Sequence, residues 1–592
     1  MFQPQPAPVG GSLALSALVA ALPLITLFVL LGALKWKAWQ AGLTSLVVAI
    51  VVAVAFFGMP ASQALITATE GGAFGLFPII YIVLTAIWIF RLTELTGYDL
   101  VLRRAFASVS PDQRVQAILI AFCFGALLEA LAGFGTPVAV TAVMLMAVGI
   151  RPVKAAAVAL VANTAPVAFG AVAVPITTLG KITGLDPASL GAMVGRQTPI
   201  LALFVPLILV FMVDGRRGLR EAWLPAVVAG LAFSIGQFLT SNFWNYQVAD
   251  IVASFAGALA VVALLRVWSP SEVLGTDGIS SADSAHTTTA SRSVAIASGA
   301  GGTTSTGSTG SAGVAGTTAL VDEDDPEPPA HLGESGGPTT GPVTGRETLM
   351  AFAPYLIVVA LFTLVSFGPL KTYLDTHSGW KFQWPGLEIL NAAGKTPAAA
   401  TFNLNVFTAA GTVLLIAGIL TALVYRVSPG KALRSLGRVI VDFRFTILTV
   451  VAVLALAYVM NFSGQTGTLG TALAETGALF AFLSASVGWI GVAVTGSDTS
   501  SNSLFGVLQV TAAKETGISE YLLASANTSG GVLGKMISPQ NLAIAAAVVG
   551  MEGKESVLFR KVIFWSLGLL LGMCALVYLQ STDVLGWMVV TP

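Results

Sequence analysis

Long apolar runs alternate with short polar segments along almost the whole chain. Each run approaches the length that a helix needs to cross a bilayer, which is about 20 residues for a hydrocarbon core of about 30 Å. The pattern predicts an all-α polytopic membrane protein with about 12 transmembrane helices. The predicted spans are 13–34, 40–57, 74–91, 153–180, 198–213, 222–241, 247–267, 349–367, 402–424, 443–461, 520–549 and 561–580.

Two further apolar stretches, 115–150 and 478–513, are interrupted by polar, glycine-rich residues. A break exposed to lipid would leave backbone N–H and C=O groups without partners, so it must be buried in protein or line a wet cavity. We therefore predict two re-entrant hairpins with interrupted helices. Two ordinary short spans joined by a tight turn are the alternative.

Residues 269–346 differ in composition from the rest of the chain. They are rich in Ser, Thr, Gly and Ala and contain the acidic run 322–325. Because too few apolar side chains are present to build a core, we predict a disordered cytoplasmic linker.

The chain contains a partial copy of itself. Asn163 and Pro175 recur with the same spacing as Asn527 and Pro539. An odd number of predicted spans separates the copies, so we predict two inverted-topology repeats, an arrangement typical of secondary transporters. The predicted domains are the first repeat, 1–213 (hairpin 115–150, broken helix 153–180), two linking transmembrane helices, 214–268, the linker, 269–346, and the second repeat, 347–592 (hairpin 478–513, broken helix 520–549).

The distribution of lysine and arginine sets the orientation. Most of these residues fall in cytoplasmic segments if the N-terminus lies outside and each hairpin returns to the side from which it enters. We therefore predict a multi-pass protein of the bacterial cytoplasmic (inner) membrane with both termini outside. The first apolar run is too long for the apolar region of a signal peptide and is expected to be retained as a span.

Composition narrows the functional classes. Hydrophobic residues make up 55% of the chain and charged residues 10%, compared with about 25% charged residues in soluble domains. The 29 basic and 29 acidic residues cancel, which gives no reason to expect a nucleic-acid partner. The three histidines lie in polar connecting segments and the two cysteines in apolar runs, so no metal site, haem or other cofactor is predicted.

Three charged residues stand out at membrane depth: Glu129, Asp498 and Lys535. A charge at the centre of a membrane helix costs about 2.5–3.5 kcal/mol on insertion scales, so such residues rarely lack a role. We predict that Lys535 faces the carboxylate of a substrate; a structural ion pair with Glu129 or Asp498 is the alternative. Glu129 and Asp498 are predicted to carry a proton, because burial favours the uncharged carboxyl group.

Small polar residues at the interruptions are predicted to assist substrate binding, because hydroxyl groups and free amides at helix ends can bind an anion. These residues are Gly135, Thr136, Asn163, Thr164, Ser497, Asn527, Thr528 and Ser529. Asn163 and Asn527 have an alternative, purely structural role in satisfying backbone groups at the breaks. Four further acidic residues are expected to be solvated near the membrane surfaces: Glu70, Glu94, Asp99 and Glu475.

Three stretches of the chain resemble the bacterial L-lactate permease family: 125–137 (GALLEALAGFGTP), 497–502 (SDTSSN) and 526–531 (ANTSGG). The likeness covers nearly all of the chain except the 269–346 linker, which looks like an insertion peculiar to this sequence or its close relatives. The resemblance implies a secondary active transporter, not an enzyme, that takes up L-lactate, often with D-lactate and glycolate, together with a proton. The implied partners are the small substrate, the proton and the lipid bilayer, with a homodimer as one candidate oligomeric state.

The paired hairpins and Asn-Thr breaks are also similar to a broader ion-transporter superfamily that includes sodium-coupled di- and tricarboxylate carriers. In those carriers a Ser-Asn-Thr motif at the hairpin tips helps to bind sodium, whereas the tips here read GFGTP (133–137) and GSDTS (496–500). A sodium-coupled carboxylate carrier is therefore the second interpretation, followed by a membrane sensor or a channel. One lysine at membrane depth favours a substrate with a single negative charge.

Overall fold

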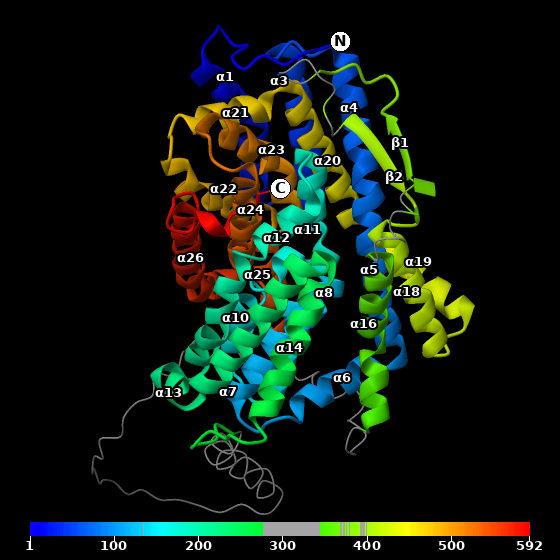
Figure 1. Ribbon diagram of the computed structural model, residues 1–592, viewed down its shortest axis with the longest axis vertical. Helices are drawn as coiled ribbons and strands as arrows, with labels where there is room; N and C mark the ends of the chain where they lie inside the picture. Colours follow the sequence, from blue (N-terminus) through cyan, green and yellow to red (C-terminus); the bar gives the residue numbers. More distant parts are fainter. Residues whose placement is uncertain are drawn as a thin grey trace, which may run out of the picture.

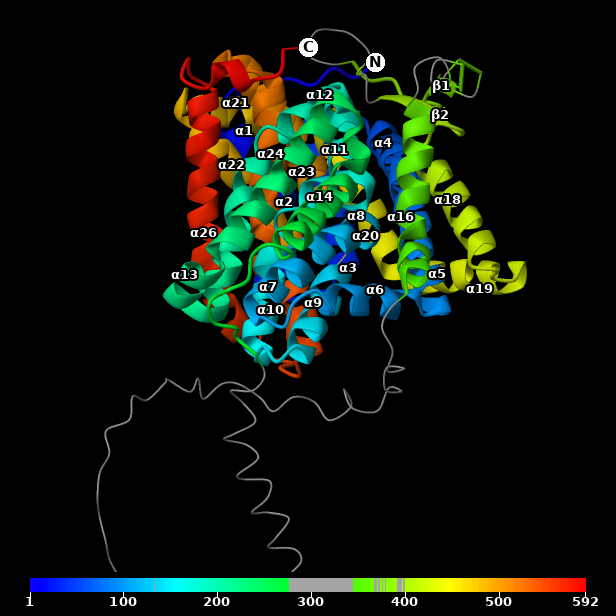
Figure 2. The ribbon, with the colours of Figure 1, turned by 60° about the horizontal axis from the view of Figure 1, so that its bottom comes forward.

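The computed structural model describes residues 1–133, 135–275, 344–366, 370, 373–374, 376–377, 379–390, 397 and 400–591. Most of the predicted linker lies outside these residues. The described chain is almost entirely helical (Figure 1). In two views α22 (Leu479–Thr495) and α26 (Glu555–Gln580) lie on one side, and α16 (Gly345–Ser366) and α18 (Ala410–Val424) on the opposite side (Figure 1, Figure 2).

The remaining helices follow in chain order. The first half contains α1 (Leu13–Ala20), α2 (Leu22–Phe28), α3 (Ala38–Ala55), α4 (Ala61–Phe74), α5 (Tyr81–Thr96), α6 (Tyr98–Ala107), α7 (Gln113–Gln116), α8 (Gly125–Ala132), α9 (Thr136–Ala147), α10 (Pro152–Ala162), α11 (Gly170–Thr183), α12 (Pro187–Val194), α13 (Thr198–Phe243) and α14 (Ala249–Leu264). The second half adds α19 (Pro429–Asp442), α20 (Arg444–Ser463), α21 (Gln465–Ala474), α23 (Asp498–Thr516), α24 (Glu520–Gly534) and α25 (Pro539–Val548). The π-helical segments are Val29–Ala33, Gly75–Ile80 and Ala117–Phe124, and the 3₁₀ turns are Val167–Phe169, Tyr246–Val248, Lys535–Ile537 and Gly586–Met588.

Within the described residues, 9 helical segments are long and apolar enough to cross a membrane, or up to 10 if the bent pair Pro152–Ala162 and Val167–Thr183 counts as one span. The protein is therefore a polytopic, mainly α-helical membrane protein. Sequence periodicity placed about 12 crossings in the same chain. One reason for the difference is that the segment Pro187–Phe243 is counted once although it is bent.

The long helix α13 folds back on itself. The Thr198 hydroxyl donates to Gln237 Oε1 at 3.2 Å, and the Ser234 hydroxyl donates to the Pro199 carbonyl at 2.7 Å. In a straight helix Thr198 and Gln237 would lie about 58 Å apart. The reversal occurs at Gly215, whose φ of +60° suits glycine. The two predicted spans 198–213 and 222–241 are therefore the two arms of α13.

A two-stranded antiparallel sheet corrects the prediction of an all-α chain. Strand β1 (Gly379–Gln383) pairs with β2 (Thr401–Asn405), with Gly379 opposite Asn405. The sheet segment rests on α4, since Trp384 Nε1 donates to Thr69 Oγ1 at 3.1 Å. The predicted span 402–424 consequently began too early. Its first residues alternate apolar and polar side chains, which is the period of a strand.

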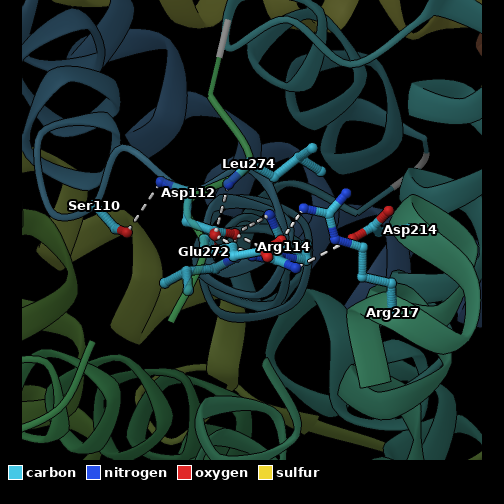
Figure 3. A network of polar contacts seen from close by, with 8 residues as sticks. Ser110, Asp112, Arg114, Asp214, Arg217, Glu272 and Leu274 are labelled. Carbon is cyan, nitrogen blue, oxygen red and sulfur yellow. Dashed lines mark hydrogen bonds and ion pairs between the residues drawn. The ribbon is translucent and has the colours of Figure 1, made fainter. Parts of the chain in front are cut away.

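The first residues of the predicted linker, up to 275, are described and make hydrogen bonds to the helices. Arg114, with its side chain 1% exposed, pairs with Asp112 at 2.7 Å and Asp214 at 3.1 Å and donates to the Glu272 carbonyl. The Leu274 amide donates to Asp112 Oδ2 at 3.0 Å. Figure 3 shows this network, which ties the segment after α14 to α7 and to the bend of α13.

Glycines allow α22 and α24 to pack with their backbones in contact. A Cβ atom at Gly530 would lie 2.0 Å from the Ala485 carbonyl oxygen, and one at Gly488 would lie 1.9 Å from the Asn527 carbonyl oxygen. Small residues at such crossings are typical of membrane helix pairs. This contact holds the helix that follows the second hairpin against the hairpin itself.

Replacing Gly530 with alanine is therefore expected to destabilise the protein by about 1–3 kcal/mol, the usual cost of overpacking. The measurement is thermal unfolding of detergent-purified protein. Gly568→Ala on α26 is the matched control, because no atom lies within 4 Å of a Cβ there. Equal transition temperatures for the two variants would contradict the close α22–α24 contact.

Candidate functional site

The two helix hairpins and the two interrupted helices meet around one cavity of about 470 Å³. The interruptions follow from local sequence. Gly133 (φ +33°) ends α8, and Gly496 (φ +75°) ends α22. Ser497 then caps α23 by accepting a hydrogen bond from the Ser500 amide at 3.3 Å. Lining residues from these breaks are Glu129, Gly133, Gly170, Pro175, Thr495, Ser497, Asp498, Thr499 and Lys535.

The start of α11 has a strained backbone beside this cavity. Ala171, Val172 and Ala173 all have positive φ, between +45° and +58°. A left-handed turn costs L-residues roughly 1–2 kcal/mol each. Strain of this kind concentrates at ligand sites, where the surrounding packing holds it. Ala171 itself lines the cavity.

A buried ion pair forms one wall. Lys535 Nζ lies 2.6 Å from Glu129 Oε1, with the two side chains 8% and 4% exposed. Asn163 Nδ2 donates to the other carboxylate oxygen, Oε2, at 2.9 Å. A Cβ atom at Gly170 would lie 2.8 Å from Glu129 Oε1, so glycine leaves room for the carboxylate. Three predicted residues are therefore in contact: Glu129 and Asn163 from the first half of the chain, and Lys535 from the second half.

The second predicted carboxyl group lies in the same cavity without an ion pair. Asp498 is the first residue of α23 and is 3% exposed. Among the described residues, neither of its carboxylate oxygens has a hydrogen-bond partner. Gly531 of α24 lies against the Asp498 carboxyl group. A Cβ atom at Gly531 would lie 2.3 Å from Asp498 Oδ1, so only glycine fits there.

Three predicted ligands on α24 are not among the residues that line the cavity: Asn527, Thr528 and Ser529. Asn527 Nδ2 donates to Asn502 Oδ1 at 2.9 Å, and Asn502 Nδ2 donates to Thr528 Oγ1 at 2.8 Å. The Ser529 hydroxyl donates to Gln197 Oε1 at 2.7 Å. This polar network joins α23 to α24 and α24 to the residue before α13.

Three predicted ligands of the first repeat, Gly135, Thr136 and Thr164, also make contacts within the fold. The Thr164 hydroxyl donates to the Val161 carbonyl at 2.7 Å, within its own helix end. The Thr136 amide donates to the Gly133 carbonyl at 3.0 Å and closes the hairpin turn. Gly135 faces Ile544 of α25. Their roles as substrate ligands stay predictions.

Sequence analysis did not single out the buried Asp250, and it placed the buried Glu70 near a membrane surface. Asp250 is 1% exposed and accepts a hydrogen bond from Gln237 Nε2 at 2.8 Å, while its Oδ2 has no partner among the described residues. It lies within electrostatic range of Glu129 and Lys535. Glu70, expected to be solvated, is fully buried with neither oxygen partnered in the described chain. A carboxyl group near the end of an apolar run looks interfacial until the packing is known.

Asp250→Ala is expected to lower stability by about 1–3 kcal/mol, because the buried Gln237 amide loses the nearer of its two acceptors and keeps only the Ala165 carbonyl at 3.4 Å. Asp250→Asn keeps an acceptor oxygen in the same place and should unfold within a few degrees of the wild type. Thermal unfolding in detergent distinguishes the two variants. Equal losses from both would show that the negative charge, rather than the hydrogen bond, supports the fold.

A cavity lined by an ion pair, a second carboxyl group and interrupted helices, in a polytopic membrane protein, is typical of a transporter for a small molecule. Comparison with known proteins agrees with this class. The sequence profile of the family described as L-lactate permease matches residues 16–304 and 330–583. The chain belongs to the L-lactate permease family, which indicates a transporter rather than an enzyme.

Individual relatives match over nearly their full length. Glycolate permease GlcA of Escherichia coli (strain K12) is 39% identical over 95% of this chain and 94% of its own. The L-lactate permeases of the same strain and of Bacillus subtilis (strain 168) are each 37% identical over 98% of both chains. A solved chain, the Alcanivorax borkumensis YdaH transporter, covers 84% of each chain at 14% identity and a TM-score of 0.38, which is too distant to place residues.

The family match also corrects the extent of the likeness. It enters the predicted linker from both ends, so the expectation that all of 269–346 lies outside the family pattern is wrong. Within the predicted linker, residues 305–329 have no match to the family profile.

Proposed function

We propose that this protein takes up L-lactate, with D-lactate and glycolate as further substrates, in symport with a proton across the bacterial inner membrane. The names of its relatives support lactate and glycolate as substrates. The observation that carries the coupling proposal is the Lys535–Glu129 ion pair in the cavity wall, 2.6 Å between Nζ and Oε1. It supplies one cation for the substrate and one carboxylate for the proton.

The coupling follows from competition for a single ammonium group. With Glu129 ionised, Lys535 is neutralised and has little attraction for an anion. A proton on Glu129 removes that charge, and the buried ammonium then needs a new counter-ion. The carboxylate of lactate provides it. The empty site and the loaded site therefore both have a net charge of zero. This balance favours movement of one proton with each anion.

Neighbouring groups give the site its orientation. Asn163 donates to Glu129 Oε2 and can do so in either protonation state, so it holds the side chain in place. The hydroxyl groups of Thr495, Ser497 and Thr499 line the cavity and can bond the 2-hydroxyl of the substrate. Asp498 is the second candidate for the proton. Gly135, Thr136 and Thr164 are proposed as indirect contributors through the turn and the helix end that they form. Asn527, Thr528 and Ser529 lie within α24 rather than at its break, and are proposed to contribute through the hydrogen bonds that hold α24 to α23 and to Gln197.

Alternating access between two inverted repeats is part of the proposal. It is supported by the position of the cavity, where a hairpin and an interrupted helix from each half of the chain come together. We also propose the full set of about 12 crossings, both termini outside, and a homodimer as the oligomeric state to test first.

Radiolabelled L-lactate uptake into proteoliposomes tests this function. An imposed inward proton gradient should drive accumulation that a protonophore abolishes. An inward sodium gradient alone should not. Accumulation that needs sodium would identify a sodium-coupled carboxylate carrier instead, and no uptake under either gradient would refute the substrate.

A further inference from the structure

A second cavity, of about 380 Å³, is lined by Tyr458 near the end of α20, whereas residues near the start of that helix line the candidate site. Elements α4, α11, α20 and the β1–β2 sheet contribute its walls, on the side where Figure 2 shows the sheet, α12 and the N-terminus. Its described lining includes Lys181, Lys381, Thr401, Tyr458, Phe74 and Phe402.

The charge of this cavity has one sign. Both charged side chains in its described lining are lysines, Lys181 and Lys381, and they are close enough to repel each other. Neither takes part in an ion pair with any described carboxylate. The nearby carboxylate of Asp186 is engaged elsewhere, since it accepts from the Ser189 amide and hydroxyl at 2.8 Å each.

Two helices connect this cavity with the candidate site. Pro175 of α11 lines the site, and Lys181 of the same helix lines the second cavity, about 9 Å further along at 1.5 Å per residue. Phe445 of α20 lines the site mouth and Tyr458 lines the second cavity, about 20 Å apart along the helix. The two cavities therefore lie at different levels along α11 and α20.

We propose that the second cavity is an outer capture site for a small monocarboxylate anion, held by the ammonium groups of Lys181 and Lys381 before it passes to Lys535. This inference rests on the proposed function and on its orientation with the N-terminus outside. A cleft with low-dielectric walls and charges of one sign concentrates oppositely charged solutes and raises association rates by about 10- to 1,000-fold. Thr401 and Tyr458 offer hydroxyl groups beside the two cations, and Phe74 and Phe402 form the apolar wall.

The test is the kinetics of L-lactate uptake by the full-length protein in right-side-out vesicles. The double variant Lys181→Gln/Lys381→Gln should raise the apparent KM about tenfold at low ionic strength, with the loss in KM rather than in the maximal rate. Salt at about 0.5 M should narrow the difference by screening. Lys181→Arg/Lys381→Arg should retain the wild-type KM. Lys514→Gln is the matched control, an exposed lysine already paired with Glu520 at 3.4 Å.

Several outcomes would overturn the inference. An unchanged KM in the Gln/Gln variant, or a lower maximal rate at unchanged KM, would remove the capture site while leaving lactate transport intact. A similar KM increase in Lys514→Gln would show a general surface potential and no site. Absence of uptake by the wild-type protein would refute the proposed function itself, and this inference with it.

Discussion

Lys535→Gln is expected to lower L-lactate uptake by at least about 30-fold. Removing one partner of a buried, hydrogen-bonded charge pair costs about 2–5 kcal/mol, and each 1.4 kcal/mol corresponds to a factor of about 10. In this site the group that is lost is the ammonium that pairs with Glu129 in the cavity wall. Initial uptake rates in proteoliposomes, normalised to folded protein by size-exclusion chromatography, measure the effect.

The structural alternative for Lys535 needs its own control. If Lys535→Gln fails to fold, the cause is the unpaired Glu129 carboxylate left behind in the protein interior. The double variant Glu129→Gln/Lys535→Gln removes both charges and should restore folding without restoring uptake. Transport by the folded double variant would show that the pair only holds helices together.

Glu129→Gln is expected to separate exchange from accumulation. Glutamine resembles the protonated acid, so Lys535 stays free to bind lactate and lactate-for-lactate counterflow should continue. The empty carrier, however, then has an unpaired buried ammonium group and cannot return. Proton-driven net accumulation should fall at least about 100-fold, since an uncompensated buried charge costs about 3–5 kcal/mol.

Counterflow and net uptake measured on the same proteoliposomes give the comparison. Asp498→Asn is the matched control, as it removes the other cavity carboxyl group without touching the ion pair. Net proton-driven accumulation by Glu129→Gln at the wild-type rate would contradict this role for Glu129 and indicate that Asp498 carries the proton.

The sequence located the chemistry of the site better than its geometry. Glu129, Asp498 and Lys535 stood out because charges are costly in apolar stretches, and all three line one cavity. Their pairing was not predictable, because Lys535 and Glu129 are separated by 406 residues and either carboxyl group could have been the partner. Asp250 was not predicted as a buried residue, for a different reason. It lies next to the polar end of a predicted span, where a carboxyl group looks solvated.

The fold was predictable to a similar degree. Apolar length predicted the helices, and glycine with polar residues predicted the breaks near Gly133 and Gly496. The return of α13 on itself matched two short apolar runs separated by charged residues. The β1–β2 sheet was missed because its partners are short and separated by a connection with no hairpin signal, and pairing of strands is a long-range property.

The most direct test of counter-ion exchange is the number of protons that enter with each lactate. Proteoliposomes that contain a pH-sensitive dye report acidification while radiolabel reports lactate, with the membrane potential clamped at several values and Lys535→Gln vesicles as the blank. Counter-ion exchange at Lys535 predicts one proton for each lactate at every potential. Uptake without acidification, or a ratio that changes with the potential, would contradict it.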